Sequence, residues 1–287
     1  MKAYSVGFYR LGYKKCYIIL FEVFILKKFL SLSLIIAAIL YCQAVLYGGK
    51  TNPCDTKICS QAAVTPVPRA DAWWMQRHQA IVDRVKQGNV DLIMIGDSIT
   101  HYWENSGKQV WDKYYAGRNA VNMGFGSDKT QHVLWRLQNC EIDDIKPKLS
   151  VIMIGTNNSG DPTASAEQIA DGIKAIVCQL RTKLPEAKVL ILAIFPCGSD
   201  EQMKASKSDA VFNPQWAKNN KISKFASKIA DNKMIFYLNI NKEFLNKKGV
   251  LTREVMPDLL HPNEKGYQIW AEAMEPMIVK LMGENTK

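Results

Sequence analysis

The sequence predicts an α/β protein, a three-layer sandwich in which helices cover both faces of a five-stranded parallel sheet. Short apolar runs of strand length alternate along the chain with longer segments in which apolar residues have helical spacing. This alternation is typical of parallel sheets, because their crossover connections are usually helices. The short runs are continuously apolar, which indicates strands that are buried on both faces.

The expected elements follow one another in a regular order. We expect strands near 91–95, 119–123, 149–154, 188–195 and 234–239, and helices near 72–87, 131–139, 164–184, 214–231 and 263–283. The helix near 164–184 carries Ile169, Ile173, Ile176 and Leu180, a spacing that predicts one buried face. Right-handed crossovers bring the carboxyl ends of all the strands to one edge, where open α/β sheets bind ligands.

The first fifty residues differ in composition from the rest of the chain. Residues 1–50 hold seven of the 37 Lys and Arg but one of the 27 acidic residues, so the net charge of +10 falls to +4 for the remainder. An apolar stretch at 29–41 follows Lys27 and Lys28, which is the pattern of an export signal. Residues 1–47 are therefore expected to be a cleaved signal or an uncleaved anchor, with 29–47 as the membrane tether in the second case.

The body of the protein is accordingly expected to be exported, either secreted or periplasmic. Residues 48–71 are rich in Pro, Gly and Thr and predict a linker, and one catalytic domain is expected over 72–285. Lipid attachment at Cys42 is a weaker alternative, because bulky Tyr41 precedes it. The basic residues of the body are scattered and lack interleaved aromatics, so no nucleic-acid partner is expected.

The histidines and cysteines form no metal-binding pattern. Four histidines without a His-Glu-x-x-His motif argue against a zinc site, and no cofactor is expected. Cys54 and Cys59 are spaced for a local disulfide, whereas Cys178 lies on an apolar helical face and is expected to be a plain core residue. Cys197 lies in an expected loop. His78, on the first helix, is expected at the surface or in an interface.

Residues at several predicted strand ends point to a catalytic serine. Ser98, in Gly-Asp-Ser, stands directly behind an apolar run, where it is either a nucleophile or a residue that caps a helix. Far downstream, Asp258 lies three residues before His261, and these are the acid and base that would activate a serine. The Gly-rich turn at 122–128 and the amide of Asn157 follow two further strands and offer oxyanion donors. Together they suggest a serine hydrolase.

These blocks resemble the SGNH or GDSL hydrolase family, and more closely its subgroup of platelet-activating factor acetylhydrolase catalytic subunits. The resemblance covers roughly 72–283 and includes the run 130–137 and the segment 261–267. It implies the flavodoxin-like SGNH hydrolase fold, with Ser98 as nucleophile, His261 as general base and Asp258 as the residue that orients the base. The implied oxyanion donors are the backbone N–H groups of Ser98 and Ser127 and the side-chain amide of Asn157.

The chain departs from the family pattern at two positions. Ser127 stands where the family normally has glycine, so the backbone N–H survives but the local φ must suit a residue with a Cβ. Cys197 stands where related sequences often carry arginine. The polar stretch that follows, at 199–213, is expected to form a loop over the site.

The expected activity is hydrolysis of short-chain acyl esters. By the same resemblance, Ile99, Thr156 and Leu260 would wall the acyl pocket, and their bulk favours a short chain such as acetyl. The alternative is that Ile99 and Leu260 are ordinary packing residues. We expect an exported esterase that acts through an acyl-Ser98 intermediate on a small-molecule or glycan ester.

A second hypothesis is a non-catalytic module that keeps this fold to bind a glycan or a partner, with its chemistry weakened by Ser127. Neither the alcohol half of the substrate nor the oligomeric state is predicted.

Overall fold

The computed structural model describes residues 62–199 and 213–284, and these belong to the second of the two units into which the chain divides, residues 53–287. Their centre is a five-stranded parallel sheet in the order β2-β1-β3-β4-β5. The strands are β1 (Leu92–Gly96), β2 (Ala120–Gly124), β3 (Leu149–Met153), β4 (Lys188–Leu192) and β5 (Ile235–Leu238). The predicted α/β class and parallel sheet are confirmed.

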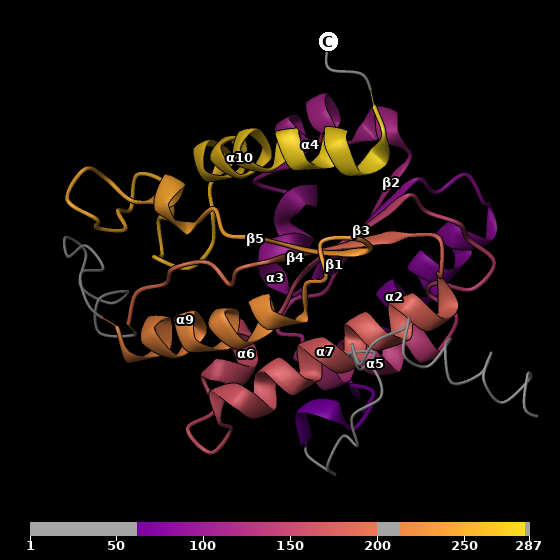
Figure 1. Ribbon diagram of the computed structural model, residues 1–287, viewed down its shortest axis with the longest axis horizontal. Helices are drawn as coiled ribbons and strands as arrows, with labels where there is room; N and C mark the ends of the chain where they lie inside the picture. Colours follow the sequence, from indigo (N-terminus) through magenta and orange to yellow (C-terminus); the bar gives the residue numbers. More distant parts are fainter. Residues whose placement is uncertain (1–61, 200–212, 285–287) are drawn as a thin grey trace, which may run out of the picture. The chain divides into compact units, whose positions relative to one another are not determined.

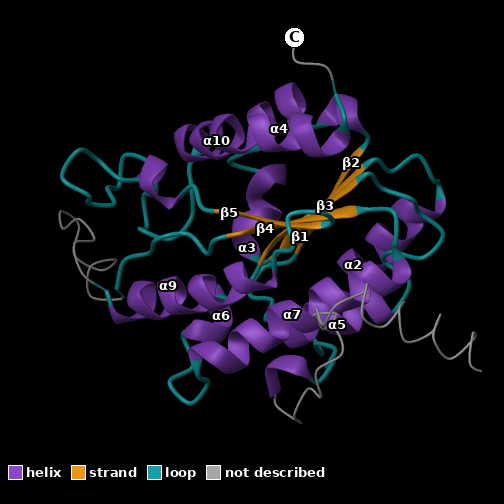
Figure 2. Ribbon diagram, in the orientation of Figure 1, coloured by secondary structure: helices purple, strands orange, loops and turns teal. Residues whose placement is uncertain are grey.

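Helices cover both faces of this sheet (Figures 1 and 2). One face carries α4 (Lys108–Tyr114) and α10 (Glu264–Met282), and the other carries α2 (Ala72–Lys86), α5 (Thr130–Gln138), α7 (Ala166–Lys183) and α9 (Pro214–Ala226). Two one-turn helices, α3 (Ser98–His101) and α6 (Thr156–Ser159), stand behind the ends of β1 and β3. Short 3-10 turns complete the described elements: η1 (Ala62–Val64), η2 (Tyr102–Glu104), η3 (Ala116–Arg118), η4 (Ser227–Ile229) and η5 (Asn241–Phe244).

Side chains of β1 show how two cores hold the sheet. Ile93 and Ile95 pack into the core beneath α2, α5, α7 and α9. Leu92 and Met94 point the other way, into the core beneath α4 and α10. All five residues of β1 are buried, which explains why the strand is continuously apolar. Because each such side chain contributes about 1.5–3 kcal/mol on burial, the carboxyl edge of the sheet is a rigid platform.

The strand order places a topological switch point at the end of β1. β2 pairs with one side of β1 and β3 with the other, so the chain reverses its direction across the sheet at this strand. Ligands of open α/β sheets bind at such a switch point, outside the carboxyl ends of the strands. Ser98 is the second residue after β1 and therefore stands at this switch point.

Helix ends follow the expected capping chemistry. Ser165 and Gln168 form a capping box at the start of α7, and Asn263 accepts the N–H of Gly266 at the start of α10. Gly283 ends α10 with a φ of 71°, the left-handed conformation that glycine adopts most easily. Helix α4 was not predicted, because a seven-residue helix offers too short an apolar period to recognise.

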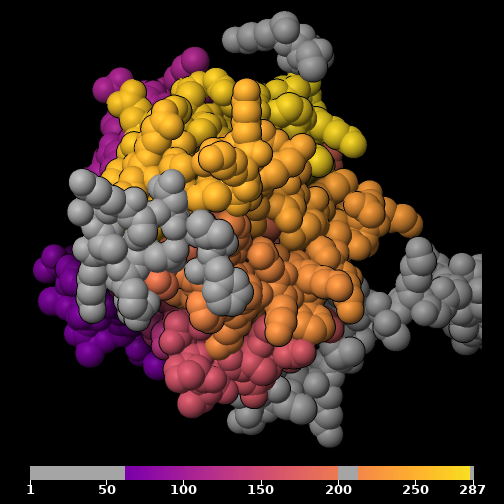
Figure 3. Space-filling model, turned by 90° about the vertical axis from the view of Figure 1, so that its left-hand side faces the viewer, coloured from indigo at the N-terminus to yellow at the C-terminus, as the bar shows by residue number. Residues whose placement is uncertain are grey.

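Several sequence predictions lie outside the described residues. They concern the leader and tether at 1–47, the cysteines at 54 and 59, and most of the loop expected at 199–213. Figure 3 shows one face of the described part, where the orange surface that begins at α9 lies between red α7 and yellow α10. Across residues 62–199 and 213–284, no helix has the length and apolarity to cross a membrane.

Two side-chain predictions are wrong. His78 is not at the surface: it is 6% exposed, and its Nδ1 lies 2.9 Å from a carboxylate oxygen of Glu141. Cys178 is not a plain core thiol, because it is disulfide-bonded. It lies at the half-buried margin of the apolar stripe of α7, where a partner can reach it. Cys140 and Cys197 are free thiols.

Candidate active site

Ser98 is placed by a close approach between α3 and the end of β2. Asp97 caps α3, because its Oδ1 accepts the N–H of Ile99 at 3.0 Å. A Cβ built on Gly124 would lie 2.2 Å from the backbone nitrogen of His101. Only glycine permits this approach, so the glycine that ends β2 allows the helix carrying Ser98 to lie against the sheet edge.

His261, which lies 163 positions after Ser98 in the chain, contacts the Ser98 hydroxyl. Its Nε2 lies 2.8 Å from Ser98 Oγ, and its Nδ1 lies 2.6 Å from Oδ2 of Asp258. With the Nδ1 proton donated to the carboxylate, Nε2 carries the lone pair that can accept the hydroxyl proton. The structure thus joins the three predicted residues in one continuous hydrogen-bonded chain.

Asp258 is fixed by the main chain of its own loop. Its Oδ1 accepts the N–H groups of Leu260 at 3.0 Å and His261 at 2.7 Å. Burial raises the pKa of this carboxyl, but the hydrogen bonds from the His261 side chain and from these backbone groups outweigh it and lower the pKa to about 2. Asp258 is therefore ionised at neutral pH and holds the imidazole in one orientation.

The loop that carries Asp258 and His261 is anchored at Leu259. This residue is fully buried and has a φ of 60°, and its carbonyl accepts the N–H of Gly198 at 2.6 Å. The ring of Tyr102 packs 5.0 Å from the imidazole of His261. These contacts hold the imidazole above Ser98.

Two of the predicted oxyanion donors, Ser127 and Asn157, follow the ends of β2 and β3. Ser127 has a φ of 62°, which is the left-handed conformation that the family glycine would adopt without strain. Asn157, in the first turn of α6, donates one hydrogen of its side-chain amide to the carbonyl oxygen of Asp128 at 2.9 Å. Its second amide hydrogen has no acceptor in this contact and is free to meet an oxyanion.

Residues 94–269 match the model of the GDSL-like Lipase/Acylhydrolase family. The chain belongs to this family.

Known GDSL-like relatives share most of their length with the chain. Platelet-activating factor acetylhydrolase IB subunit alpha1 from Homo sapiens is 31% identical over 224 residues, which cover 77% of this chain and 90% of that protein. Subunit alpha2 from Mus musculus is 32% identical over 220 residues, with 75% and 88% covered.

Solved structures of the same fold include two hydrolases. A GDSL-like lipase from Bacteroides thetaiotaomicron has a TM-score of 0.54 at 17% identity and covers 72% of this chain and 96% of its own. An acetylxylan esterase from Geobacillus stearothermophilus has a TM-score of 0.51 at 16% identity, with 68% and 94% covered. These likenesses confirm the fold. The family match and the acetylhydrolase relatives make the protein a carboxylic ester hydrolase.

Two polar residues beside the GDSL-like serine were not assigned from the sequence. Asp97 is 1% exposed, and burial raises its pKa to about 7 against the opposing hydrogen bond from Ile99. His101 accepts the N–H of Gly126 at Nδ1, at 3.3 Å, and burial with the nearby Arg77 lowers its pKa to about 4. The neutral ring of His101 therefore links the serine helix to the turn with Ser127. Its place three residues after Ser98 was the available signal.

The predicted acyl-pocket residues of this GDSL-like hydrolase differ in burial. Ile99 and Thr156 are buried, at 1% and 5% exposed, and Leu260 is half-buried. Ile99 belongs to the core around α10, and Leu260 packs against that core. Both the pocket role and the alternative of simple packing fit this placement.

Cys197 is a buried thiol and not a second nucleophile. It is 1% exposed, and burial raises its pKa to about 12, so the thiolate does not form at neutral pH. Asn219 donates its side-chain amide to the sulfur at 3.7 Å. Among the residues that the structure describes, no cluster of three His, Cys, Asp or Glu side chains is arranged to hold a metal ion.

Proposed function

We propose that the protein hydrolyses short-chain acyl esters, with acetyl as the preferred acyl group, through a covalent acyl-Ser98 intermediate. The observation that carries this proposal is the unbroken hydrogen-bonded chain from Asp258 through His261 to the oxygen of Ser98, at 2.6 and 2.8 Å. Such a chain converts a weakly nucleophilic hydroxyl into one whose proton has an acceptor at the moment of attack.

The proposed reaction has two halves. In the first, Ser98 Oγ attacks the ester carbonyl while Nε2 of His261 takes the hydroxyl proton, and the tetrahedral intermediate collapses as that proton passes to the leaving alcohol. In the second, His261 takes a proton from water as the water oxygen attacks the acyl-Ser98 ester, and the second tetrahedral intermediate collapses as that proton passes to Ser98 Oγ, which releases the carboxylic acid and restores the serine. Asp258, held ionised, stabilises the imidazolium that forms in each half.

The tetrahedral oxyanion needs donors that are already in place. The proposed donors are the N–H groups of Ser98 and Ser127 and the second amide hydrogen of Asn157. The contact between Asn157 and the Asp128 carbonyl supports this role, because it fixes the plane of the amide. Donors that do not reorganise stabilise the transition state more than the ground state.

Acetyl preference is supported by the residues next to the catalytic groups. Ile99, Thr156 and Leu260 would leave room for a short chain, and the curated relatives are named acetylhydrolases. A series of p-nitrophenyl acetate, butyrate and octanoate tests this, and each added methylene is expected to cost about 1–3 kcal/mol in kcat/KM. In Leu260→Ala, kcat/KM should fall less from the acetate to the octanoate than it does in the wild-type protein. Equal kcat/KM for all three esters in the wild-type protein would contradict the proposal.

A carbohydrate is the proposed alcohol half of the substrate. Trp73 is 42% exposed, and a Cβ built on Gly126 would lie 3.8 Å from its ring. The guanidinium of Arg69 lies 5.3 Å from the ring centroid, and the His101 ring is stacked with it at 6.3 Å, so it is the remaining exposed part of the indole that stands beside the turn with Ser127. A sugar ring can stack its C–H face on such a surface. The acetylxylan esterase among the fold neighbours acts on a substrate of this class. Trp73→Ala should raise KM for an acetylated xylo-oligosaccharide and leave KM for ethyl acetate unchanged. An equal change for both esters would contradict this assignment.

Export is proposed from the apolar stretch at 29–41 and from the disulfide at Cys178. Disulfides persist in oxidising compartments and are rare in the cytosol, so the bonded state of Cys178 supports an exported domain. Fractionation of a bacterium that expresses the full chain should find the protein outside the cytoplasm, and N-terminal sequencing then distinguishes a cleaved signal from an anchor. Recovery in the cytoplasm with Cys178 reduced would overturn this proposal.

A further inference from the structure

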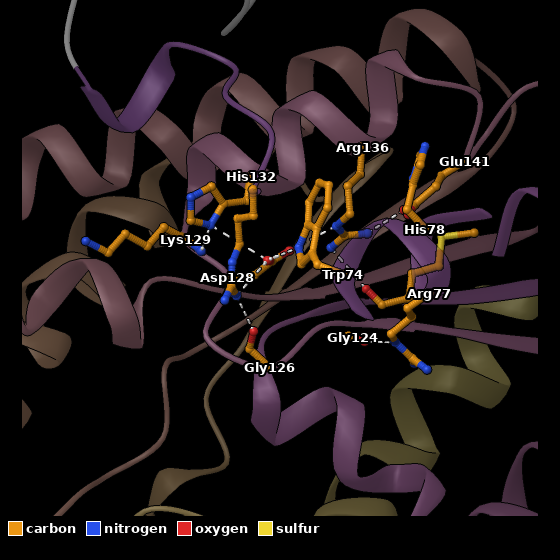
Figure 4. Close-up of polar contacts among 12 residues, drawn as sticks. Trp74, Arg77, His78, Gly124, Gly126, Asp128, Lys129, His132, Arg136 and Glu141 are labelled. Carbon is orange, nitrogen blue, oxygen red and sulfur yellow. Dashed lines mark hydrogen bonds and ion pairs between the residues drawn. The ribbon is translucent and has the colours of Figure 1, made fainter. Parts of the chain in front are cut away.

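Two arginines donate hydrogen bonds to the turn at 126–128. Arg136 on α5 approaches it from the interior, and Arg69, on the segment before α2, approaches it with a side chain that is 18% exposed. Figure 4 shows the interior side, where Arg136 lies between Asp128 and Glu141, with His78 beyond.

The interior contacts immobilise the side chain of Asp128. Arg136 donates from Nε to Asp128 Oδ2 at 2.9 Å and from Nη1 to Glu141. Trp74 donates its indole N–H to Asp128 Oδ1 at 2.7 Å. The side chains of Asp128, Arg136 and Glu141 have no exposed area. Both carboxylate oxygens of Asp128 are therefore occupied, and its main-chain carbonyl stays where it receives the amide of Asn157.

The outer contact acts on the peptide bond that carries the Ser127 N–H. Arg69 donates from Nη1 to the carbonyl oxygen of Gly126 at 2.6 Å. This carbonyl and the N–H of Ser127 belong to the same peptide unit, and none of the described peptide bonds is cis. In a trans peptide the C=O and N–H point in opposite directions. By holding the carbonyl on one side, Arg69 directs the N–H to the other.

This peptide needs an external restraint more than an ordinary one does. Ser127 has a φ of 62°, which costs a residue with a Cβ about 1–2 kcal/mol, and the neighbouring Gly126 has wide conformational freedom. The opposite end of Gly126 is held by a longer contact, from its N–H to Nδ1 of His101 at 3.3 Å. The charge-assisted bond from Arg69 is the stronger of the two restraints.

Hydrogen bonds to α5 hold the segment that carries Arg69. The N–H of Val67 donates to the carbonyl of Gln131 at 3.2 Å, and the hydroxyl of Thr130 donates to the carbonyl of Ala63 at 2.8 Å. The segment before α2 is thus tied to α5, the helix that follows the turn. Arg69 lies outside residues 94–269, the part that matches the family model, so it is a contribution from beyond the matched domain.

We propose that Arg69 is a positioning residue for ester hydrolysis: through the Gly126 carbonyl it aims the Ser127 N–H at the oxyanion. This inference rests on the proposed function. Loss of alignment of one oxyanion donor should act on the transition state and leave ground-state binding of the substrate almost unchanged.

The test compares Arg69→Gln and Arg69→Lys with Arg84→Gln. Arg84 is a matched control, because it also donates from Nη1 to a glycine carbonyl, that of Gly88 at 2.9 Å, away from the site. With p-nitrophenyl acetate, Arg69→Gln should lower kcat about 10- to 100-fold with KM within about twofold of wild type. Affinity for a trifluoromethyl ketone, whose hemiketal with Ser98 carries an oxyanion, should fall by the same factor. Arg69→Lys should recover part of both losses, and Arg84→Gln should change neither.

Three outcomes would overturn the inference. These are an unchanged kcat in Arg69→Gln, a loss of kcat without loss of trifluoromethyl ketone affinity, or an equal loss in Arg84→Gln. Arg69→Lys keeps the positive charge and a donor, so a native unfolding temperature with partial recovery supports positioning even if Arg69→Gln is unstable. Ser98→Ala distinguishes failure of the proposed function from failure of this inference. Full activity in Ser98→Ala would contradict the proposed function. An inactive Ser98→Ala together with a fully active Arg69→Gln would contradict the inference about Arg69 alone.

Discussion

The two sides of the site are built in opposite ways. On the acid–base side, the side chains of Asp258 and His261 are 48% and 24% exposed, and Asp258 is held mainly by backbone groups of its own loop. On the oxyanion side, the side chains of Asp128 and Arg136 are fully buried and paired with each other.

This difference follows from what each side must do. In the proposed reaction His261 exchanges protons with an alcohol and then with water, so it has to be reachable from solvent. Oxyanion donors move no proton and only have to stay aimed, which a buried ionic network ensures. Changes on the first side should therefore affect the rate with little effect on stability, and changes at the centre of the second should affect stability strongly.

Removal of the base is the largest expected effect and lies on the exposed side. His261→Ala should lower kcat for p-nitrophenyl acetate by about 10⁴-fold or more, because His261 is the group that accepts the Ser98 proton in the proposed reaction. The unfolding temperature should stay close to that of wild type, because the imidazole is partly exposed. A large fall in unfolding temperature would show that the exposed acid–base side also contributes strongly to stability, contrary to the comparison of the two sides.

On the buried side, Arg136→Met should cost about 3–5 kcal/mol of unfolding free energy, because it leaves the carboxylates of Asp128 and Glu141 buried without their cation. Arg118→Met is the control: Arg118 also pairs with two carboxylates, Glu275 and Glu284, but these side chains are 28% and 31% exposed. That variant should lose about 1 kcal/mol or less. Denaturant unfolding measures both, and equal losses would show that burial is not the deciding factor.

Two carboxyls near Ser98 should give stability profiles of opposite sign with pH. Burial raises the pKa of Asp97 from 3.8 to about 7, so the native state favours its protonated form. The stability that Asp97 contributes is then fully present below pH 3.8 and is lost as the pH rises through 7. Relative to Asp97→Asn, the wild-type protein should lose about 4 kcal/mol across that range.

Asp258 supplies the opposite case. Its pKa is lowered to about 2, so its contribution is present above pH 3.8 and lost as the pH falls through 2. Because this side chain is half exposed, the loss relative to Asp258→Asn should be on the order of 1 kcal/mol. Denaturant unfolding at a series of pH values measures both differences, and profiles of the same sign for the two variants would contradict the assignment.

The smallest expected effect concerns the strained turn. Ser127→Gly should stabilise the protein by up to about 1 kcal/mol, because glycine adopts a φ of 62° without a Cβ penalty. Ser127→Val should destabilise it, because a β-branched side chain suits this conformation least. Thermal unfolding orders the three proteins. A glycine variant that is less stable than wild type would show that the serine side chain makes a compensating contact.

Features that leave a local sequence pattern could be predicted, whereas contacts formed only in the tertiary structure could not. The strands and Ser98 were predictable, because burial on both faces and a strand-end serine leave local patterns. The contacts among Asp128, Arg136, Glu141 and His78 were not. Asp128, Arg136 and Glu141 lie eight and five residues apart without a helical pairing pattern, and His78 comes from 63 residues before Glu141. His78, expected at the surface or in an interface, is instead buried against Glu141, a residue 63 positions away in the chain. Arg69 was missed because it stands in a Pro-rich segment that has the composition of a linker.

The central claim is that Ser98 is the nucleophile and carries the acyl group between the two halves of the reaction. The most direct measurement is acid quenching during turnover of p-nitrophenyl acetate, followed by mass analysis of the peptides. We expect one acetyl group on the peptide that holds Ser98, and neither acetyl group nor turnover in Ser98→Ala. An acetyl group on another residue, or undiminished turnover in Ser98→Ala, would contradict the account.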